Sequence, residues 1–408
     1  MLSDISTAHQ TTNTAQPKQT RSDERGPRTL EPAGNSQPAD TDPNASNTPV
    51  PISRGYSAAP RRWLHGLTIG LVVVTFVLLI LGGTVTSHGV GLAVSDWPTS
   101  LGYNMFLLPP RLWQGGILVE HTHRLLASFV GFYTMVVCLC LCLTQRHRPW
   151  LCWVGCAAVV IVIGQGIMGG LRVTELSVAW GVFHGITAQL FFLVTVLIAT
   201  ATGPLWDRRS RPSANGPNRF DTRLRRCAGM MLAILIIQLI LGAGMRHTGS
   251  GLAIPDFPTS YGGLVPPFTA EQIEAAHSEI VPYDQFEGDA YPTSSQVAVH
   301  FAHRAWAVAT LLGGIWLFAR AQRFAAFDMA ILRPALATLA LLLVQIGLGA
   351  LVVVSGRHPE LATAHQATGA AILATAALLA IRTHALRPAP VSGEEGGPAE
   401  RRWAVAVG

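Results

Sequence analysis

Long apolar segments alternate with short polar ones along most of this chain. A helix needs about 20 mostly apolar residues to cross the ~30 Å hydrocarbon core of a bilayer, and eight segments are long enough. They are Trp63–Thr86, Val119–Leu143, Trp150–Leu171, Val178–Thr200, Leu224–Met245, Val297–Ala319, Leu332–Val354 and Leu361–Ile381. The pattern predicts an all-α integral membrane protein with eight transmembrane helices.

An internal repeat divides these segments into two sets of four. GVGLAVSDWPTSLG begins at Gly89, and its near-copy GSGLAIPDFPTSYG begins at Gly249, 160 residues later. EHTHR (120–124) corresponds to HFAHR (300–304), and QGIMGGLRV from Gln165 corresponds to QIGLGALVV from Gln345. Because the order is kept, we predict two pseudo-symmetric four-helix bundles.

The repeat also sets the expected organisation of the chain. Residues 61–202 and 224–384 form the two halves, and 203–223 form a basic linker between them. Residues 1–60 are rich in Ser, Thr, Pro, Asn, Asp and Gln, which predicts a disordered cytoplasmic segment, and 385–408 are expected to form a flexible tail.

Charge is scarce and unevenly placed. Only 13% of residues are charged, and the mean hydropathy is +0.35. Arginines gather before the first apolar segment, in every second connection and after the last segment, whereas acidic residues gather in the other connections. The positive-inside rule then predicts that both termini are cytoplasmic. The formal net charge of +6 therefore reports membrane topology, and we expect no nucleic-acid partner.

The six cysteines lie in or beside the apolar segments, towards the expected cytoplasmic ends. We expect no disulfide framework and interpret them as small apolar residues that pack between helices. They are Cys138, Cys140, Cys142, Cys152, Cys156 and Cys227.

Each half carries a pair of histidines inside apolar segments. His123 and His184 form the first pair, and His303 and His365 occupy matching places in the second half. Ionisable side chains in hydrocarbon are costly and usually face the bundle interior. Two imidazoles facing each other in an apolar bundle suit the axial positions of haem iron, and glycines in the third and seventh segments would let a macrocycle approach.

Other interpretations of these histidines stay open. Hydrogen-bonded packing accounts well for a single intramembrane histidine, but less well for four placed by a duplication. A zinc or di-iron site would need more carboxylates, and only Glu120 and His123 form a Glu-x-x-His pair.

Two further positions carry candidate chemistry. Arg124 and Arg304 directly follow ligand candidates, so they either pair with haem propionates or extend to the lipid headgroups. Glu120 in the first half corresponds to His300 in the second. This difference suggests that one half performs chemistry while the other holds a helper cofactor.

These residues resemble the haem A synthase family. The resemblance covers about residues 63–381. It rests on LGGTVTSHGVGLAVSDWP after the first segment, on Glu120, His123, Arg124 and His184, and on LGAGMRHTGSGLAIPDFP, His303, Arg304 and His365 in the second half. Some family members carry a cysteine pair in the first outer loop, and this chain has none there.

The resemblance implies a bacterial-type multi-pass plasma-membrane enzyme that oxidises the C8 methyl group of haem O to the formyl group of haem A. It implies haem b between His303 and His365, haem O at His123 and His184, and Glu120 as the catalytic residue. Haem O synthase and terminal-oxidase assembly factors are candidate partners, surrounded by membrane lipid, and a homo-oligomer is compatible with it.

Two other classes share the histidines and the topology. A di-haem b-type electron carrier would keep two haems and release no haem product. A haem transporter or assembly chaperone would not need Glu120. Another feature to be explained is the long second outer loop, Val265–Gln296, with an expected short helix around Glu271–His277.

Overall fold

The computed structural model describes residues 62–209, 222–280, 291–325 and 328–385. The predicted segment 1–60, most of the linker 203–223 and nearly all of the tail 385–408 lie outside these described residues.

Eight described helices are long and apolar enough to cross a membrane, which confirms the predicted transmembrane architecture. The helices are α1 (Arg62–Ser87), α2 (Gly115–Thr144), α3 (Pro149–Thr174), α4 (Val178–Thr202), α6 (Thr222–His247), α8 (Ser294–Ala325), α9 (Met329–Val354) and α10 (Pro359–His384). Each extends past its predicted segment at one or both ends, because apolar residues mark only the part of a helix that contacts hydrocarbon.

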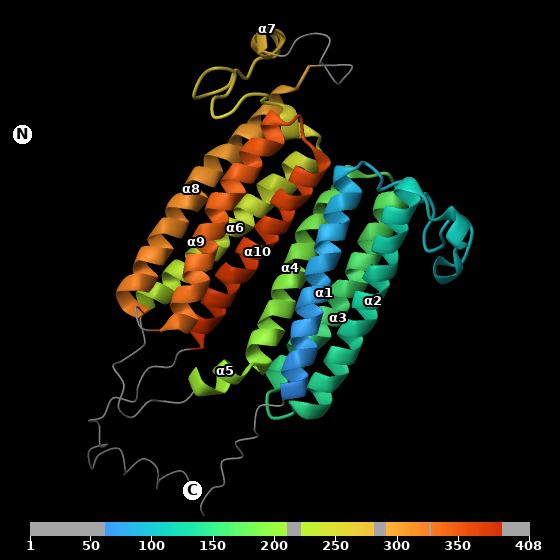
Figure 1. Cartoon of the computed structure of the whole chain (residues 1–408), viewed down its shortest axis with the longest axis vertical. Helices are drawn as coiled ribbons and strands as arrows, with labels where there is room; N and C mark the ends of the chain where they lie inside the picture. The colour runs from blue at the N-terminus through green and yellow to red at the C-terminus, as the bar shows by residue number, and fades with distance from the viewer. Residues whose placement is uncertain (1–61, 210–221, 281–290, 326–327, 386–408) are drawn as a thin grey trace, which may run out of the picture. The chain divides into compact units, whose positions relative to one another are not determined.

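The helices form two groups of four that lie side by side (Figure 1). In the first group α1 contacts α2 and α4, and α3 contacts α2 and α4; in the second, α6 contacts α8 and α10, and α9 contacts α8 and α10. Each group encloses an apolar core of its own. A third core, which includes Leu79 of α1, Phe192 of α4 and Ala370 of α10, joins the groups. The exact symmetry between the groups stays a prediction.

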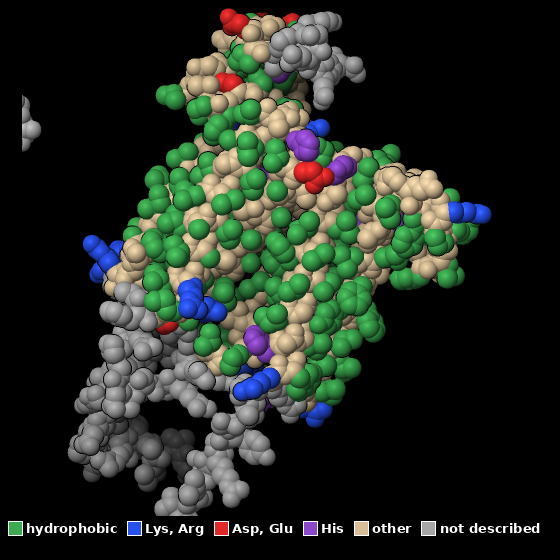
Figure 2. Space-filling model, in the orientation of Figure 1, with side chains coloured by type: hydrophobic (Ala, Val, Ile, Leu, Met, Phe, Trp, Pro, Cys, Tyr) green, Lys and Arg blue, Asp and Glu red, His purple; other side chains and the backbone are tan. Residues whose placement is uncertain are grey.

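Hydrophobic side chains cover the visible flank of the helices (Figure 2). Large apolar residues that face outward include Val160, 69% exposed, and Leu312, 61% exposed. Exposed apolar surface on this scale would aggregate in water, but it is the expected surface of a protein solvated by lipid. The chain is therefore a multi-pass membrane protein.

A proline inside α9 has its hydrogen-bonding defect repaired by another helix. Pro334 has no backbone N–H, so the carbonyl of Ala330, four residues earlier, loses its helical partner. Arg382 of α10 donates to that carbonyl at 2.7 Å. In a lipid environment an unsatisfied backbone carbonyl is costly, so this bond stabilises the joint between α9 and α10.

The long second outer loop contains the expected short helix, α7 (Ala270–Ile280), which extends past the predicted range at both ends. Its buried residues are Ile273 and His277. The ring of His277 lies beside Tyr261, and the Tyr261 hydroxyl is 3.3 Å from Nδ1 of His277. Burial lowers the pKa of His277. One face of α7 thus packs on the second of the two repeated stretches, 89–102 and 249–262, which we call the outer motifs; the glutamates of α7 lie on its exposed side.

Candidate functional site

Four histidine rings pack directly over glycines of neighbouring helices. A Cβ atom built on Gly82 of α1 would lie 3.1 Å from Cε1 of His123, and one on Gly242 of α6 would lie 3.0 Å from Cε1 of His303. The same holds for Gly169 with His184 (3.4 Å) and for Gly349 with His365 (3.1 Å). A methyl group at most of these positions would push the ring away, so the glycines determine where the imidazoles lie.

In the second group, His303 of α8 and His365 of α10 meet across the bundle. Their ring centroids are 6.5 Å apart. Two imidazoles that share one metal ion, each at ~2 Å from its nitrogen, have ring centres about 6 Å apart. The structure therefore brings these two predicted ligands to a separation at which one iron atom would fit.

Glutamine amides line the same histidines. The amide nitrogen of Gln238 on α6 lies 3.3 Å from Nδ1 of His303, and that of Gln345 on α9 lies 3.1 Å from Nε2 of His365. Polar partners of this kind orient a ligand histidine and restrict its ring to one position.

In the first group, His123 of α2 lies within electrostatic range of His184 of α4. In the amide orientation that gives hydrogen bonds to both its nitrogen and its oxygen, Gln165 of α3 donates from its amide nitrogen to Nδ1 of His184 at 3.0 Å. His123 differs, because among the described residues its Nδ1 atom is buried without a hydrogen-bond partner. One member of this pair is therefore held less tightly than its counterpart His303.

Glu120 is buried, with 3% of its surface exposed, and both of its carboxylate oxygens are engaged. The amide of Val94 donates to Oε2 at 2.9 Å, and Arg124 donates to Oε1 at 2.7 Å. The structure thus places Glu120 one helical turn from His123, fixed between the outer loop and an arginine.

His300 occupies the matching place in the second group and faces the same kinds of donor. The amide of Ile254 lies 3.2 Å from its Nδ1, and Nε of Arg304 lies 3.0 Å from its Nε2. A neutral imidazole accepts at only one ring nitrogen, whereas a carboxylate accepts at both oxygens. The exchange of Glu120 for His300 therefore keeps the position but changes the charge.

Arg124 and Arg304 bind the backbone of the outer motifs. Arg124 donates to the carbonyls of Asp96 (2.6 Å), Thr99 (3.1 Å) and Val94 (2.6 Å). Arg304 donates likewise to Asp256 (2.8 Å), Thr259 (3.0 Å) and Ile254 (3.0 Å). Each arginine therefore fixes the backbone of one outer motif to the next membrane-spanning helix. Contact between these arginines and haem propionates stays a prediction.

An aspartate organises each outer motif from within. Asp96 accepts from the amides of Leu101 (2.6 Å) and Gly102 (2.9 Å), and Asp256 accepts from those of Tyr261 (2.7 Å) and Gly262 (2.9 Å). Burial opposes ionisation of both carboxyl groups, but these bonds and those from neighbouring threonines hold both pKa values below the ordinary range. Both motifs are therefore closed by ionised carboxylates at neutral pH.

The sequence matches a known protein family and several described proteins. The sequence profile of the COX15-CtaA family, described as cytochrome oxidase assembly protein, matches residues 62–377. The chain belongs to this family. A "Heme A synthase" of Methylorubrum populi is 27% identical over 362 residues, which cover 80% of this chain and 87% of the relative. Proteins of the same description from Bradyrhizobium strains BTAi1 and ORS 278 are each 26% identical, over 82% and 85% of this chain and 94% and 96% of theirs.

The bacterial relatives and the eight apolar helices support a plasma-membrane protein with several spans. The family match also covers the candidate site, because residues 62–377 include all four histidines, Glu120 and both outer motifs.

Sequence reasoning assigned no role to several polar residues at the site of this family member. Gln165 and Gln345 are the first residues of the third repeated stretch in each half, so the repeat alone could have indicated that these two glutamines have a role. Arg172 and Arg246 are not repeated in this way. A Cβ atom on Gly181 would lie 3.3 Å from Nε of Arg172, and Arg246 donates to the carbonyl of Gly83 at 2.8 Å.

The donor set fits haem. Each helix group offers two imidazole nitrogen donors from its second and fourth long helices, with a glycine packed closely against each ring. Among the described residues, Nδ1 of His365, like that of His123, is buried without a partner. A buried imidazole nitrogen without a partner is expected where a ligand completes the site.

Proposed function

We propose that this protein is a haem A synthase, an enzyme that oxidises a methyl group of haem O to the formyl group of haem A. The observation that carries the proposal is the glycine-packed histidine pair in each helix group, in a chain whose family relatives include proteins described as haem A synthases. The four-helix halves proposed from the repeat, 61–202 and 224–384, then each form one haem site.

The two sites have different roles in this proposal. His303 and His365 hold a resident haem b, and His123 and His184 hold haem O, which must enter and leave as haem A. The residue four before Gly242 is Gln238, which contacts His303, whereas the residue four before Gly82 is Leu78, which packs in the apolar core. An extra polar partner suits a permanent ligand, and its absence suits an exchangeable one.

Bound iron porphyrin would supply the oxidative chemistry: conversion of the methyl group to the formyl group adds one oxygen atom and removes four electrons, which must pass to an external electron acceptor. Glu120 contributes a negative charge held rigidly by Val94 and Arg124. A fixed carboxylate in a water-poor site stabilises positive charge that develops nearby, or accepts a proton. Arg172 and Arg246, which lie near the mouths of the sites, are additional candidates for binding anionic groups of the ligand.

The deciding experiment expresses the protein with a haem O synthase and identifies the haems extracted from the membrane. We expect haem A from the native chain. Glu120→Gln should reduce its yield by about 100-fold or more, in line with loss of one charged catalytic contact, and haem O or a hydroxylated product should accumulate. An unchanged yield of haem A would refute the catalytic role of Glu120.

A matched pair of variants tests whether haem A formation needs the carboxylate of Glu120 or only a side chain that anchors the loop. Glu120→His copies the residue that occupies this position in the second group, so it should retain haem binding but lose haem A formation. His300→Glu makes the reciprocal change and should leave haem A formation within a few fold. If the native chain instead carries two haems b and yields no haem A, it is an electron carrier.

Ligation by the second pair has its own test. His303→Ala should lower the content of bound haem b and remove the low-spin absorption spectrum of that site, because iron would lose one axial nitrogen. Helical content, measured by circular dichroism, should not change. A full low-spin spectrum in this variant would contradict the assignment of His303 as a ligand.

A further inference from the structure

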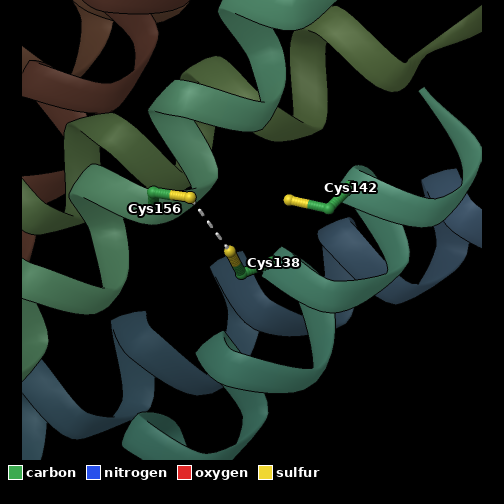
Figure 3. A group of neighbouring side chains, drawn as sticks. All are labelled: Cys138, Cys142 and Cys156. Atoms are coloured by element: carbon green, nitrogen blue, oxygen red, sulfur yellow. Dashed lines mark hydrogen bonds between the residues drawn. The ribbon is translucent and has the colours of Figure 1, made fainter. Parts of the chain in front are cut away.

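Three cysteine thiols meet between α2 and α3, near the short connection that joins these helices and contains Arg146 and Arg148. The sulfurs of Cys138, Cys142 and Cys156 all lie within 4.8 Å of one another, and the first and last are 3.8 Å apart (Figure 3). This cluster lies on the same helix as His123 but towards its opposite end, so it is separate from the proposed haem sites.

The local sequence explains why the thiols meet. Cys138 and Cys142 are one turn apart on α2 and share a face, and Cys156 projects from α3, which runs antiparallel. Gly155 lets the helices approach closely, since a Cβ atom there would lie 3.5 Å from the Cα atom of Cys138 and 3.1 Å from Leu141.

The spacing of the sulfurs matches a metal site. A thiolate bonds zinc at about 2.3 Å, so three sulfurs around one such ion lie about 4 Å apart. The three sulfurs therefore need to move by less than about 1 Å to share an ion. Thiolates select soft ions such as Cu(I), and they are also common ligands of zinc.

A fourth cysteine lies next to the cluster. Cys152 is one turn before Cys156 on α3, and its sulfur is 3.6 Å from the carbonyl of Leu141 and 3.7 Å from that of Gln145. Three sulfurs suffice for Cu(I), whereas a structural zinc ion takes four ligands. The role of Cys152 therefore distinguishes the two ions.

We propose that Cys138, Cys142 and Cys156 form a binding site for a thiophilic d10 cation that joins α2 to α3. Each coordinating thiol releases its proton to solvent as the ion binds. Arg146 and Arg148 lie in the connection between the two helices, which the positive-inside rule predicts to be cytoplasmic. If this end faces the cytoplasm, as the arginines predict, the thiols stay reduced and available.

The test uses the full-length protein, purified without oxygen into lipid nanodiscs with a non-thiol reductant. Cu(I) is titrated against a chromogenic Cu(I) chelator, and Zn(II) against a zinc indicator. We expect one ion bound per chain. X-ray absorption at the metal edge of the native protein should show sulfur neighbours at about 2.3 Å. Nitrogen or oxygen neighbours alone would overturn the proposal without any variant.

Variants identify the ligands. Cys138→Ala, Cys142→Ala and Cys156→Ala should each weaken binding by at least about tenfold, the loss that even outer-shell changes cause. Cys140→Ala is the matched control, because this residue lies between Cys138 and Cys142 but on another face of α2. An equal loss in the control, or equal metal uptake by the triple alanine variant, would refute the site.

The fourth cysteine decides which ion fits. If the site takes Cu(I) with three thiolates, Cys152→Ala should leave its affinity within about twofold. If it takes zinc with four, the same change should weaken zinc binding by at least about tenfold. A protein that binds neither ion after full reduction, but forms a bond between Cys138 and Cys156 on oxidation, would replace the metal site with a disulfide.

Discussion

A glycine packs against each imidazole at the candidate haem sites. Rings of His123, His303 and His365 occupy space that a methyl group on the facing helix would need, and the ring of His184 leaves room for no more than ordinary contact with such a group. Glycine here serves close approach between side chain and backbone rather than flexibility. The sequence contains 40 glycines, so only the contacts single out the ones that matter.

Two glycines of α9 provide a matched test at this scale. Gly349→Ala should displace His365, because the new methyl group would lie 3.1 Å from its ring, and haem affinity of the second site should fall about tenfold. Gly347→Ala meets nothing within 4 Å and should have no effect. Haem content of the purified variants, measured by absorption, makes the comparison. Equal retention in both would contradict the role of Gly349.

Among the separate elements, α7 is attached through a small buried contact that includes Tyr261 and His277. Burial, followed by the charge of Asp256, raises the pKa of Tyr261 to about 12, so its hydroxyl stays protonated and donates to the carbonyl of Ala253 at 2.5 Å. Burial also lowers the pKa of His277, so its ring is neutral when α7 is docked.

This shift predicts the pH dependence of α7 docking. His277 in the undocked helix regains an ordinary pKa of about 6.5 and binds a proton more tightly than in the docked one. Docking should therefore be full above about pH 6.5 and weaken as the pH falls below it. Hydrogen exchange of residues 270–280, corrected for the intrinsic effect of pH, should show faster opening at pH 5 than at pH 7.5.

The control is His277→Gln, which has no titrating group at this position. Its exchange, corrected in the same way, should show a much smaller difference between the two pH values. If the native protein and this variant respond equally to pH, another group controls α7.

At the scale of the whole described helical region, polar contacts supplement the apolar core between the two helix groups. Arg246 of α6 donates to the carbonyl of Gly83 and to the hydroxyl of Ser87 on α1, at 2.8 and 2.7 Å. Gln366 of α10 donates to the carbonyl of Leu79 at 3.2 Å. These directional hydrogen bonds fix the register between the two helix groups, which dispersion forces alone would not determine.

The orientation of the molecule in the membrane is predicted by its arginines and can be tested by labelling. Leu264, directly before the second outer loop, is 91% exposed. Leu264→Cys should react with a membrane-impermeant maleimide in intact cells, because the acidic loops are expected on the outer side. The native chain, whose cysteines lie in or beside the spans, is the control and should stay unlabelled. Labelling only after cell lysis would reverse the topology.

Sequence alone determined the long helices, the order of the repeat and the short helix in the second outer loop. Lipid solvation requires about 20 apolar residues in a row, which is a local property that can be read from a single segment. The same reasoning identified the four histidines, because ionisable residues stand out in an apolar background.

Tertiary structure alone decided which residues face one another across helices. Periodicity tells which residues share a face of one helix, but the rotation and approach of neighbouring helices follow from packing of the whole bundle. For this reason the glycine beside each histidine, the matching donors around Glu120 and His300, the loop-anchoring bonds of Arg124 and Arg304, and the meeting of three thiols appeared only in the folded structure.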